Sequence, residues 1–175
     1  MSALNLTSPS SVLSIMSRTQ PDIVIHLASM SDPGRCELDQ QACWAVNVPL
    51  VFLTALQRAN AALITFSSEH VYSGHPSDIR RGLTAGKEPA YSELDATHPV
   101  CAYGRSKVAL EREVSHRFPG RGIVLRLSSV LGPVSRGRSP KQSYIQLVER
   151  VLRTEPTFDA FRNEHRSFTW VIDIQ

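Results

Sequence analysis

The chain has 175 residues, of which 42% are hydrophobic and 20% charged, a balance typical of a globular domain with a buried core. No apolar run approaches the roughly 18 residues that a membrane-spanning helix needs, so we predict no membrane association. The formal net charge is only +3, far below that of a strongly basic nucleic-acid-binding domain. Nucleic acid is therefore not an expected partner.

The cysteines and the N-terminus indicate a reducing compartment. Cys36, Cys43 and Cys101 stand at irregular spacing, which gives neither a disulfide framework nor the Cys-x-x-Cys pair of a zinc site. The six histidines show no metal-ligand spacing, so we expect no metal. The first 20 residues lack the basic and apolar regions of a secretory signal. We predict a cytoplasmic protein, with an organelle transit peptide as the alternative because this start is rich in Ser and Thr.

Hydrophobic periodicity predicts alternating helices and strands. Short β-branched apolar runs between turn residues are typical of strands buried on both faces of a sheet, and apolar residues at helical spacing indicate the helices between them. Pro49 lies inside the second helical pattern and is expected to bend it. The predicted elements are a helix over 10–18, a strand over 22–28, a turn over 31–34, a helix over 39–60, a strand over 61–68, a long loop over 73–100, a helix over 102–117, a strand over 122–130, a basic stretch over 134–141, a helix over 140–153 and a strand over 167–172.

Strands that alternate with helices at this spacing indicate right-handed βαβ units. The predicted fold class is therefore α/β, a partial Rossmann-like parallel sheet with flanking helices. In such sheets ligands bind beyond the carboxyl ends of the strands. Three short segments follow the predicted strands and should meet there: residues 28–29, 67–69 and 127–132.

A tyrosine and a lysine open the predicted helix over 102–117. Tyr103 and Lys107 are four residues apart, which places both side chains on one helix face. A Tyr hydroxyl with a pKa near 10 is a poor acid–base catalyst at neutral pH, and a nearby ammonium lowers that pKa. The pair is thus a candidate proton-transfer device, and a Ser hydroxyl from the neighbouring strand end, Ser68, could hold a substrate oxygen.

Several motifs in register extend this interpretation over residues 10–175. They are PDIVIHLAS from Pro21, AVNVP from Ala45, FSSEHVYSG from Phe66, PVCAYGRSK from Pro99, LRLSSVLGP from Leu125 and HRSFTWVIDI from His165. Together they resemble the extended short-chain dehydrogenase/reductases, and within them the dTDP-4-dehydrorhamnose reductase family. That family includes the non-catalytic regulatory β subunit of methionine adenosyltransferase.

The resemblance implies a role for each matching residue. Ser68 would orient the substrate carbonyl, Tyr103 would donate the proton, and Lys107 would lower the pKa of Tyr103 and hold the nicotinamide ribose. Asn47 would position the lysine through hydrogen bonding. The remaining residues expected to line the NADP or NAD cofactor are Ala28, Ser29, Leu127 and Ser128.

The sequence departs from the family at the substrate side. Glu69 and His70 stand where the rhamnose reductases have Asp-Tyr, and Ser129 stands where they often have Trp. We take these three residues as candidate substrate contacts. A carbonyl reduction is still expected, whereas a deoxysugar-nucleotide substrate is open.

The family's glycine-rich cofactor turn has no counterpart in this sequence. No G-x-x-G-x-x-G occurs among the nine glycines, and none precedes Gly34. We therefore expect residues 1–175 to be a single incomplete NAD(P)-binding domain, with 134–175 beginning a substrate-binding lobe and with little NADPH affinity by itself. The strand that would pair with residues 23–25 is expected to be missing, which leaves an exposed edge that a protein partner could cover.

Three functions are compatible with these observations. The first is an NAD(P)-dependent reductase acting on a sugar-nucleotide-like carbonyl through Ser68, Tyr103 and Lys107. The second is a non-catalytic regulatory subunit that resembles the methionine adenosyltransferase β subunit and uses the same fold for binding. The third is an inactive fragment.

Overall fold

A computed structural model describes residues 4–78, 91–133, 143–157, 159 and 167–174. The chain divides into two compact units, Met1–Arg126 and Leu127–Gln175. Among the described helices, none is both long and apolar enough to cross a membrane. The basic stretch predicted over 134–141 and the tip of the long loop lie outside the described residues.

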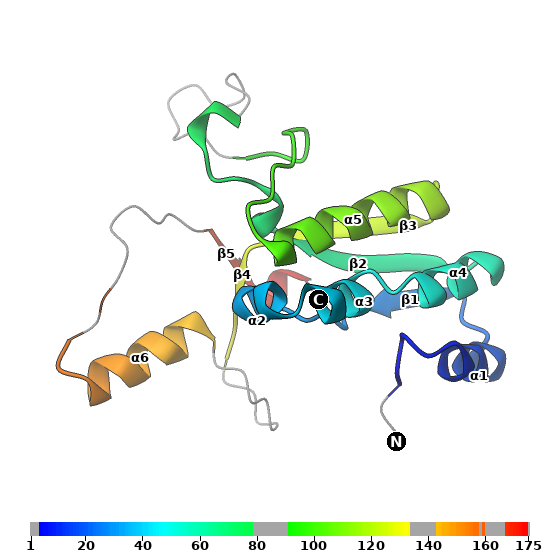
Figure 1. Ribbon diagram of the computed structural model, residues 1–175, viewed down its shortest axis with the longest axis horizontal. Helices are drawn as coiled ribbons and strands as arrows, with labels where there is room; N and C mark the ends of the chain where they lie inside the picture. The colour runs from blue at the N-terminus through cyan, green and yellow to red at the C-terminus, as the bar shows by residue number, and fades with distance from the viewer. Residues whose placement is uncertain (1–3, 79–90, 134–142, 158, 160–166, 175) are drawn as a thin grey trace. The chain divides into compact units, whose positions relative to one another are not determined.

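The first unit contains a three-stranded sheet in the order β1-β2-β3. The strands are β1 (Ile23–His26), β2 (Ala62–Ser68) and β3 (Gly122–Leu127). β1 runs parallel to β2, with Ile23 opposite Ala62 and His26 opposite Thr65. Among the strands that the structure describes, β1 has a neighbour on one side only, so its outer edge is the edge of this sheet (Figure 1). The α/β class predicted from the sequence is confirmed.

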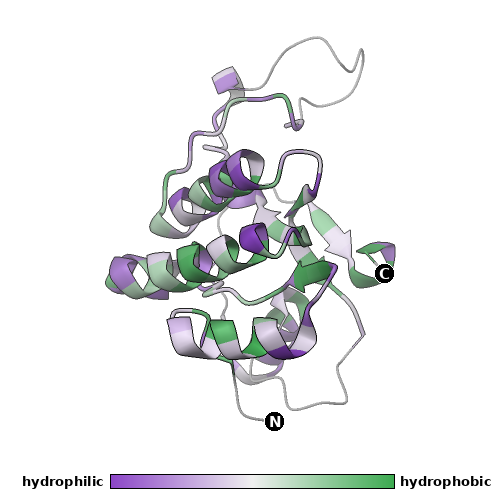
Figure 2. Cartoon of the chain, turned by 90° about the vertical axis from the view of Figure 1, so that its right-hand side faces the viewer, coloured by the Kyte–Doolittle hydropathy of each residue, from purple (hydrophilic) through white to green (hydrophobic). Residues whose placement is uncertain are grey.

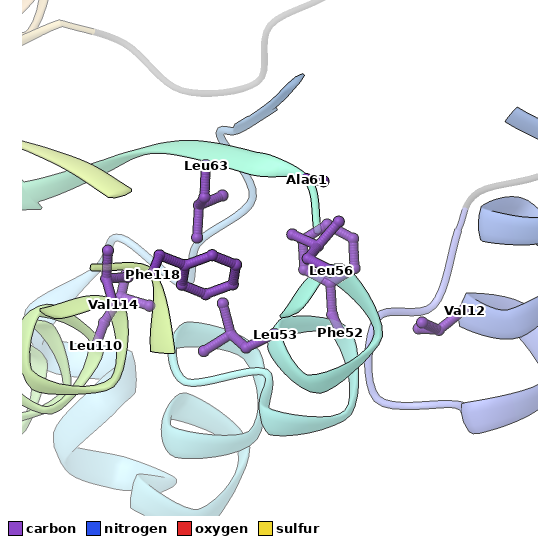
Figure 3. Close-up of a cluster of buried hydrophobic side chains, with 9 residues drawn as sticks. All are labelled: Val12, Phe52, Leu53, Leu56, Ala61, Leu63, Leu110, Val114 and Phe118. Carbon is purple, nitrogen blue, oxygen red and sulfur yellow. The ribbon is translucent and has the colours of Figure 1, made fainter. Parts of the chain in front are cut away.

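Three helices supply the hydrophobic core on one face of this sheet. α1 (Pro9–Thr19), α4 (Leu50–Arg58) and α5 (Ala102–Arg117) carry both hydrophilic and hydrophobic segments, as helices that cover a sheet do (Figure 2). Their apolar residues meet strand β2 in a cluster shown in Figure 3. The cluster consists of Val12, Phe52, Leu53, Leu56, Ala61, Leu63, Leu110, Val114 and Phe118.

The two faces of β1 differ in burial. Val24 packs against the core cluster, and His26 lies buried with its ring 5.5 Å from that of Phe52. Ile23, Ile25 and Leu27 alternate with them and are 63%, 61% and 72% exposed. The side chains of a strand point alternately to opposite faces. In the described part of the chain, the second face of β1 is therefore left open, and the prediction that this strand is buried on both faces is wrong.

Two predictions over residues 31–60 were wrong in detail. The turn expected at 31–34 opens a short helix, α2 (Pro33–Leu38), whose N-cap Asp32 accepts the Arg35 N–H. The single helix predicted over 39–60 is two helices, α3 (Gln40–Asn47) and α4. Pro49 is the N-cap residue of α4 and does not merely bend a continuous helix, because a proline nitrogen cannot donate the hydrogen bond that continuity requires.

The second unit is smaller and less buried. The strand predicted over 122–130 ends at Leu127, and β4 (Ser129–Leu131) pairs in parallel with β5 (Phe168–Trp170) in a separate sheet. A 3-10 turn, η3 (Val171–Ile174), follows β5. Helix α6 (Tyr144–Thr154) begins with a reciprocal capping box between Ser143 and Gln146. None of its described side chains is buried.

Candidate active site

The carboxyl end of β2 supplies two buried serines that point in different directions. The side chain of Ser68 accepts the His70 N–H at 3.3 Å and caps the 3-10 turn η1 (Glu69–Val71). Ser67 donates its hydroxyl proton to Glu111 on α5. Successive strand residues face opposite sides of the sheet. Ser68 therefore faces the candidate site, and Ser67 faces a neighbouring polar network.

Helix α5 delivers the tyrosine and the lysine to the same place. Its N-cap, Cys101, accepts the Gly104 N–H through sulfur at 3.4 Å, which fixes the first turn. Tyr103 is 8% exposed and Lys107 is 4% exposed. The Lys107 Nζ lies 5.6 Å from the centroid of the Tyr103 ring and donates a hydrogen bond to Phe66 O at 3.1 Å.

Burial controls the proton affinity of both groups. It raises the pKa of Tyr103 above 10, and hydrogen bonds with Ser68 and Ser29 oppose that rise without cancelling it. The lowered pKa that the Tyr–Lys spacing predicted is therefore not found, because desolvation of the phenolate outweighs the groups that stabilise it. Burial lowers the pKa of Lys107 to about 8.

The first turn of α5 lies so close to η1 that the residue after Tyr103 must be a glycine. A Cβ on Gly104 would stand 2.1 Å from His70 O, so only glycine lets the first turn of α5 lie against η1. This approach also sets His70 edge-on to Tyr103, with ring centroids 5.6 Å apart. His70 thus lies next to the tyrosine, and Glu69 occupies the first position of η1. Their roles as substrate contacts stay predictions.

Asn47 lies in the interior, with hydrogen bonds to two chain segments. Its Oδ1 accepts the Met30 N–H at 2.7 Å and the Ser29 hydroxyl at 3.0 Å. Its Nδ2 donates to Ser106 Oγ at 2.9 Å and to Met30 O at 3.1 Å. Ser106 in turn donates to Tyr103 O at 2.7 Å. These bonds tie Asn47 to the residue preceding Lys107, whereas the Lys107 Nζ bond goes to Phe66.

The residues expected to line the cofactor fall into both units. Ser29 follows β1 and interacts with Tyr103, and Ala28 precedes it beside an apolar groove of about 530 Å³ along β1. In the second unit, Ser128 and Thr169 share a hydrogen bond at 2.9 Å, and Ser129 pairs with Phe168. Leu127 ends β3. The roles assigned to Leu127, Ser128 and Ser129 stay predictions.

Sequence reasoning missed an ion-paired network beside the site. Arg126 on β3 donates two hydrogen bonds to Glu111, at 2.7 and 3.0 Å, and a third to the Tyr72 hydroxyl at 2.7 Å. Tyr72 donates to Ser92 O and stacks on Tyr91, with centroids 4.2 Å apart. The network fastens the long loop to the strand ends. Its only sequence signal is that Glu111 lies one helical turn beyond Lys107.

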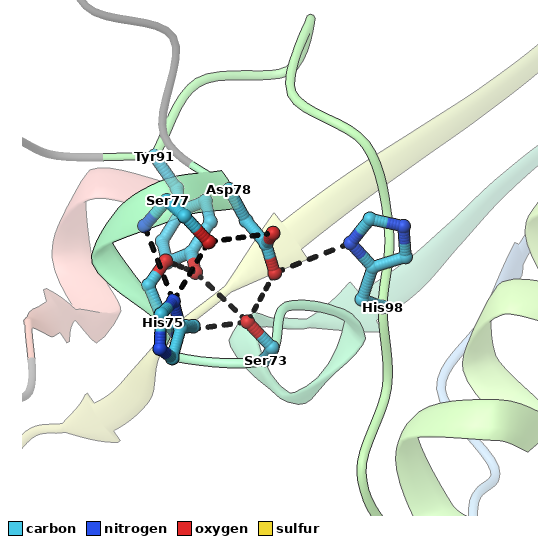
Figure 4. A network of polar contacts seen from close by, with 6 residues as sticks. All are labelled: Ser73, His75, Ser77, Asp78, Tyr91 and His98. Atoms are coloured by element: carbon cyan, nitrogen blue, oxygen red, sulfur yellow. Dashed lines mark hydrogen bonds and ion pairs between the residues drawn. The ribbon is translucent and has the colours of Figure 1, made fainter.

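A second polar cluster joins the two described arms of that loop (Figure 4). Asp78 accepts a hydrogen bond from Ser73 and pairs with His98 at 3.2 Å, and Tyr91 donates to His75 O at 3.0 Å. The bonds from Ser73 and His98 lower the pKa of Asp78. Over the described positions, no group of three or more His, Cys, Asp or Glu side chains is placed to hold a metal.

Comparison with solved structures defines the class of fold. The dTDP-4-dehydrorhamnose reductase of Bacillus anthracis in complex with NADP matches 87% of this chain and 48% of its own, with a TM-score of 0.69 at 21% identity. UDP-glucose 4-epimerase of Thermotoga maritima with UDP-glucose matches 97% of this chain and 54% of its own, with a TM-score of 0.74 at 21% identity. The chain therefore shares the Rossmann-like α/β fold of about half of each of these proteins.

Sequence comparison then gives the family. The family model described as RmlD substrate binding domain matches residues 1–175, and the chain belongs to this family. A dTDP-4-dehydrorhamnose reductase of Aggregatibacter actinomycetemcomitans is 32% identical over 133 residues, covering 75% of this chain and 41% of the relative. The methionine adenosyltransferase 2 subunit beta of Danio rerio is 29% identical over 132 residues, with 75% and 37% coverage. The chain spans about half the length, or less, of these relatives.

Proposed function

We propose that this chain provides the proton-transfer part of an NAD(P)-dependent carbonyl reductase. The observation that carries the proposal is the convergence of Ser29, Ser68 and Lys107 on the buried Tyr103 from separate segments. The three hydroxyls can donate or accept a proton, and the Lys107 Nζ lies 5.6 Å from the centroid of the Tyr103 ring. A general acid held beside a hydroxyl donor is the arrangement that carbonyl reduction requires.

Each residue has a distinct task in this proposal. When bound, the nicotinamide cofactor supplies hydride to the carbonyl carbon. Tyr103 gives its hydroxyl proton to the carbonyl oxygen while Ser68 hydrogen-bonds to the same oxygen. The ammonium of Lys107 has three N–H donors and gives one to Phe66 O, so its remaining donors suit the hydroxyls of a ribose. Ser29 and Ala28, at the end of β1, would line the cofactor.

The substrate in this proposal is a sugar-nucleotide-like ketone. Its support is the family membership of the chain and the name of the relative from Aggregatibacter, a dTDP-4-dehydrorhamnose reductase. His70 lies edge-on to Tyr103, so a substrate whose carbonyl reaches Tyr103 would pass this imidazole. Glu69 and Ser129 are the further substrate contacts we propose.

A regulatory role is the second candidate. It is favoured by the likeness to the Danio rerio methionine adenosyltransferase 2 subunit beta and by the raised pKa of Tyr103, which makes the phenol a weak acid. In this role the fold would bind a protein partner. The open edge of β1, with Ile23 and Ile25 exposed beside the apolar groove, suits an extended apolar segment that adds a strand. Three free cysteines suit the reducing cytoplasm, where we place the protein in either role.

Two measurements on the 175-residue chain separate these functions. In the first, NADPH is titrated at up to millimolar concentration while amide chemical shifts are recorded. The reductase proposal expects weak binding that shifts the amides of Ser29, Ser68 and Tyr103, and that is lost in Lys107→Met. In the second, oxidation of NADPH is followed at 340 nm with dTDP-4-dehydrorhamnose as the ketone.

The Tyr103→Phe variant decides between the two roles. If Tyr103→Phe loses turnover but still shows the amide chemical-shift changes on addition of NADPH, the reductase is supported. Localised binding with no turnover in either protein supports the regulatory module. Shift changes that avoid all three residues, or no binding at millimolar NADPH, contradict the proposed cofactor site.

A further inference from the structure

The guanidinium of Arg126 connects two parts of the candidate site that lie on different elements. Its Nε and Nη2 donate to the two carboxylate oxygens of Glu111 at 3.0 and 2.7 Å, and its Nη1 donates to the Tyr72 hydroxyl at 2.7 Å. The hydrogen bonds with Glu111 raise the pKa of Arg126 further above its ordinary value, so the group is charged at neutral pH. From Arg126 one branch of contacts therefore begins at Glu111 and a second at Tyr72.

The first branch runs through Glu111 to the end of β2. Ser67 donates its hydroxyl proton to Glu111, and the residue after it is Ser68, which we propose to hold the carbonyl oxygen. Lys107 Nζ donates to the carbonyl of the residue before Ser67, at 3.1 Å. The strand end is thus attached to α5 by two hydrogen bonds, and the carboxylate that accepts one of them is oriented by Arg126.

The second branch runs through Tyr72 to the loop beside Tyr103. Tyr72 is the C-cap of η1, and its N–H donates to Glu69 O at 3.0 Å. Its hydroxyl donates to Ser92 O at 2.7 Å, and the guanidinium lies 5.2 Å from the centroid of its ring. The turn that these contacts fix carries His70, whose ring lies edge-on to Tyr103.

We propose that Arg126 is a positioning residue for the site around Tyr103. Through its two branches it fixes Ser68 and His70 relative to the tyrosine. The proposal rests on the proposed reductase function, in which the ketone meets both of these residues. Arg126 itself moves no proton in that reaction and acts only through its partners.

The shape of the guanidinium, and not its charge alone, carries this role. Arginine presents its N–H donors in a planar fork with fixed directions, whereas the lysine ammonium is a compact charge on a flexible chain. Arg126→Lys therefore keeps the charge and loses the fork that serves Glu111 and Tyr72 together. Tyr72→Phe keeps the aromatic ring and removes only the hydroxyl of the second branch.

NMR spectra of the 175-residue chain measure the two branches separately and need no cofactor. We expect Tyr72→Phe to shift the imidazole resonances of His70 and to leave the amide of Ser67 unchanged. Arg126→Lys should shift both signals. The control is Arg153→Lys on α6, where the arginine pairs with Glu149 and is 75% exposed. This control should change neither signal.

A split between KM and kcat gives a second measurement. NADPH oxidation is followed with dTDP-4-dehydrorhamnose as the ketone. Loss of one hydrogen bond corresponds to about a fivefold change in an equilibrium, so Tyr72→Phe should raise KM for the ketone about fivefold and leave kcat unchanged. Arg126→Lys also releases the strand end that carries Ser68, so it should in addition lower kcat by about tenfold.

Several results would overturn the proposal. One is a pair of His70 and Ser67 signals that Arg126→Lys leaves as in the natural chain, since charge alone would then suffice. Another is an unchanged KM in an active Tyr72→Phe variant. Circular dichroism checks folding. If Arg126→Lys does not fold, Tyr72→Phe decides by itself, and unchanged His70 resonances in that variant refute the positioning role.

The proposed function fails by a different result. Absence of turnover in the natural chain contradicts the reductase, whereas the NMR signals of His70 and Ser67 still decide whether Arg126 positions the two strand and loop ends. Normal turnover with unshifted signals in the variants supports the reductase and refutes the role of Arg126.

Discussion

The amide nitrogen of Asn47 donates a hydrogen bond to Ser106 Oγ at 2.9 Å, and this bond joins α3 to the turn of α5 that carries Tyr103 and Lys107. The opposite end of the same side chain binds Ser29 and Met30, which follow β1. One buried amide therefore connects three segments of the candidate site. Both polar atoms of the Asn47 side chain form hydrogen bonds within the protein.

Replacement of Asn47 should be costly. In Asn47→Ala the Met30 N–H loses its side-chain acceptor, Ser106 Oγ loses a donor, and Met30 O keeps only the Cys36 thiol as a side-chain donor. Buried groups left without partners cost about 1–3 kcal/mol each, so we expect a loss of about 2–4 kcal/mol in the free energy of unfolding. Urea denaturation measures it. Ser10→Ala, at an exposed position in α1, is the control, and a loss below about 0.5 kcal/mol in Asn47→Ala would refute the anchoring role.

The ion pair between Arg126 and Glu111 should contribute more to the free energy of unfolding than an exposed Arg–Glu pair. Arg126→Ala leaves the Glu111 carboxylate with 15% side-chain exposure and without its bidentate partner, and breaking such a pair costs about 2–4 kcal/mol. Arg153 and Glu149 on α6 form the matched control, since their side chains are 75% and 59% exposed and such pairs contribute about 0–0.5 kcal/mol. A double-mutant cycle on each pair checks the difference. Equal coupling energies would contradict the expectation.

The buried Lys107 should make stability rise with pH in the alkaline range. Its pKa in the folded chain is about 8, below the ordinary 10.5. Between these two values the unfolded chain binds more protons than the folded chain, so the free energy of unfolding rises as pH increases from about 8 to 10.5. The destabilisation caused by burying the charged lysine is greatest below pH 8. Two and a half pKa units correspond to about 3 kcal/mol.

Lys107→Met tests this dependence. The variant removes the titrating group, so at pH 7 it should unfold at a higher urea concentration than the natural chain, with a gain of about 1–3 kcal/mol after the lost bond to Phe66 O. The gain should shrink as pH approaches 10.5. A gain that does not change between pH 7 and pH 10 would show that the lysine is not desolvated.

Gly104 should not tolerate a methyl group. In Gly104→Ala the new Cβ would meet His70 O at 2.1 Å, so the first turn of α5 must move away from η1. We expect a loss of about 2–4 kcal/mol in the free energy of unfolding and a shift of the His70 ring resonances. Gly34→Ala on α2, where a Cβ would stand 3.4 Å from Asp32, is the control and should change stability by less than about 1 kcal/mol. Similar losses in both variants would show that η1 does not constrain Gly104.

Much of the architecture follows from local pattern. The β-branched runs at 22–28 and 61–68 predicted β1 and β2, because an alternation of short buried strands with amphipathic segments leaves a parallel, helix-covered sheet as the stable arrangement. The spacing of Tyr103 and Lys107 predicted that they share one face of α5, since 3.6 residues complete a turn. The motif order also predicted the family to which the chain belongs.

Contacts between distant segments were beyond the reach of that pattern. The sequence determined which side chains stand at the strand ends and on the face of α5. Only the tertiary structure decided that burial, and not Lys107, controls the pKa of Tyr103, that Asn47 binds Ser106, and that Cys36 and Cys43 share a buried cluster with Tyr103. The physical reason is that periodicity depends on the local backbone, whereas desolvation and hydrogen-bond partners depend on groups that folding brings together from far along the chain.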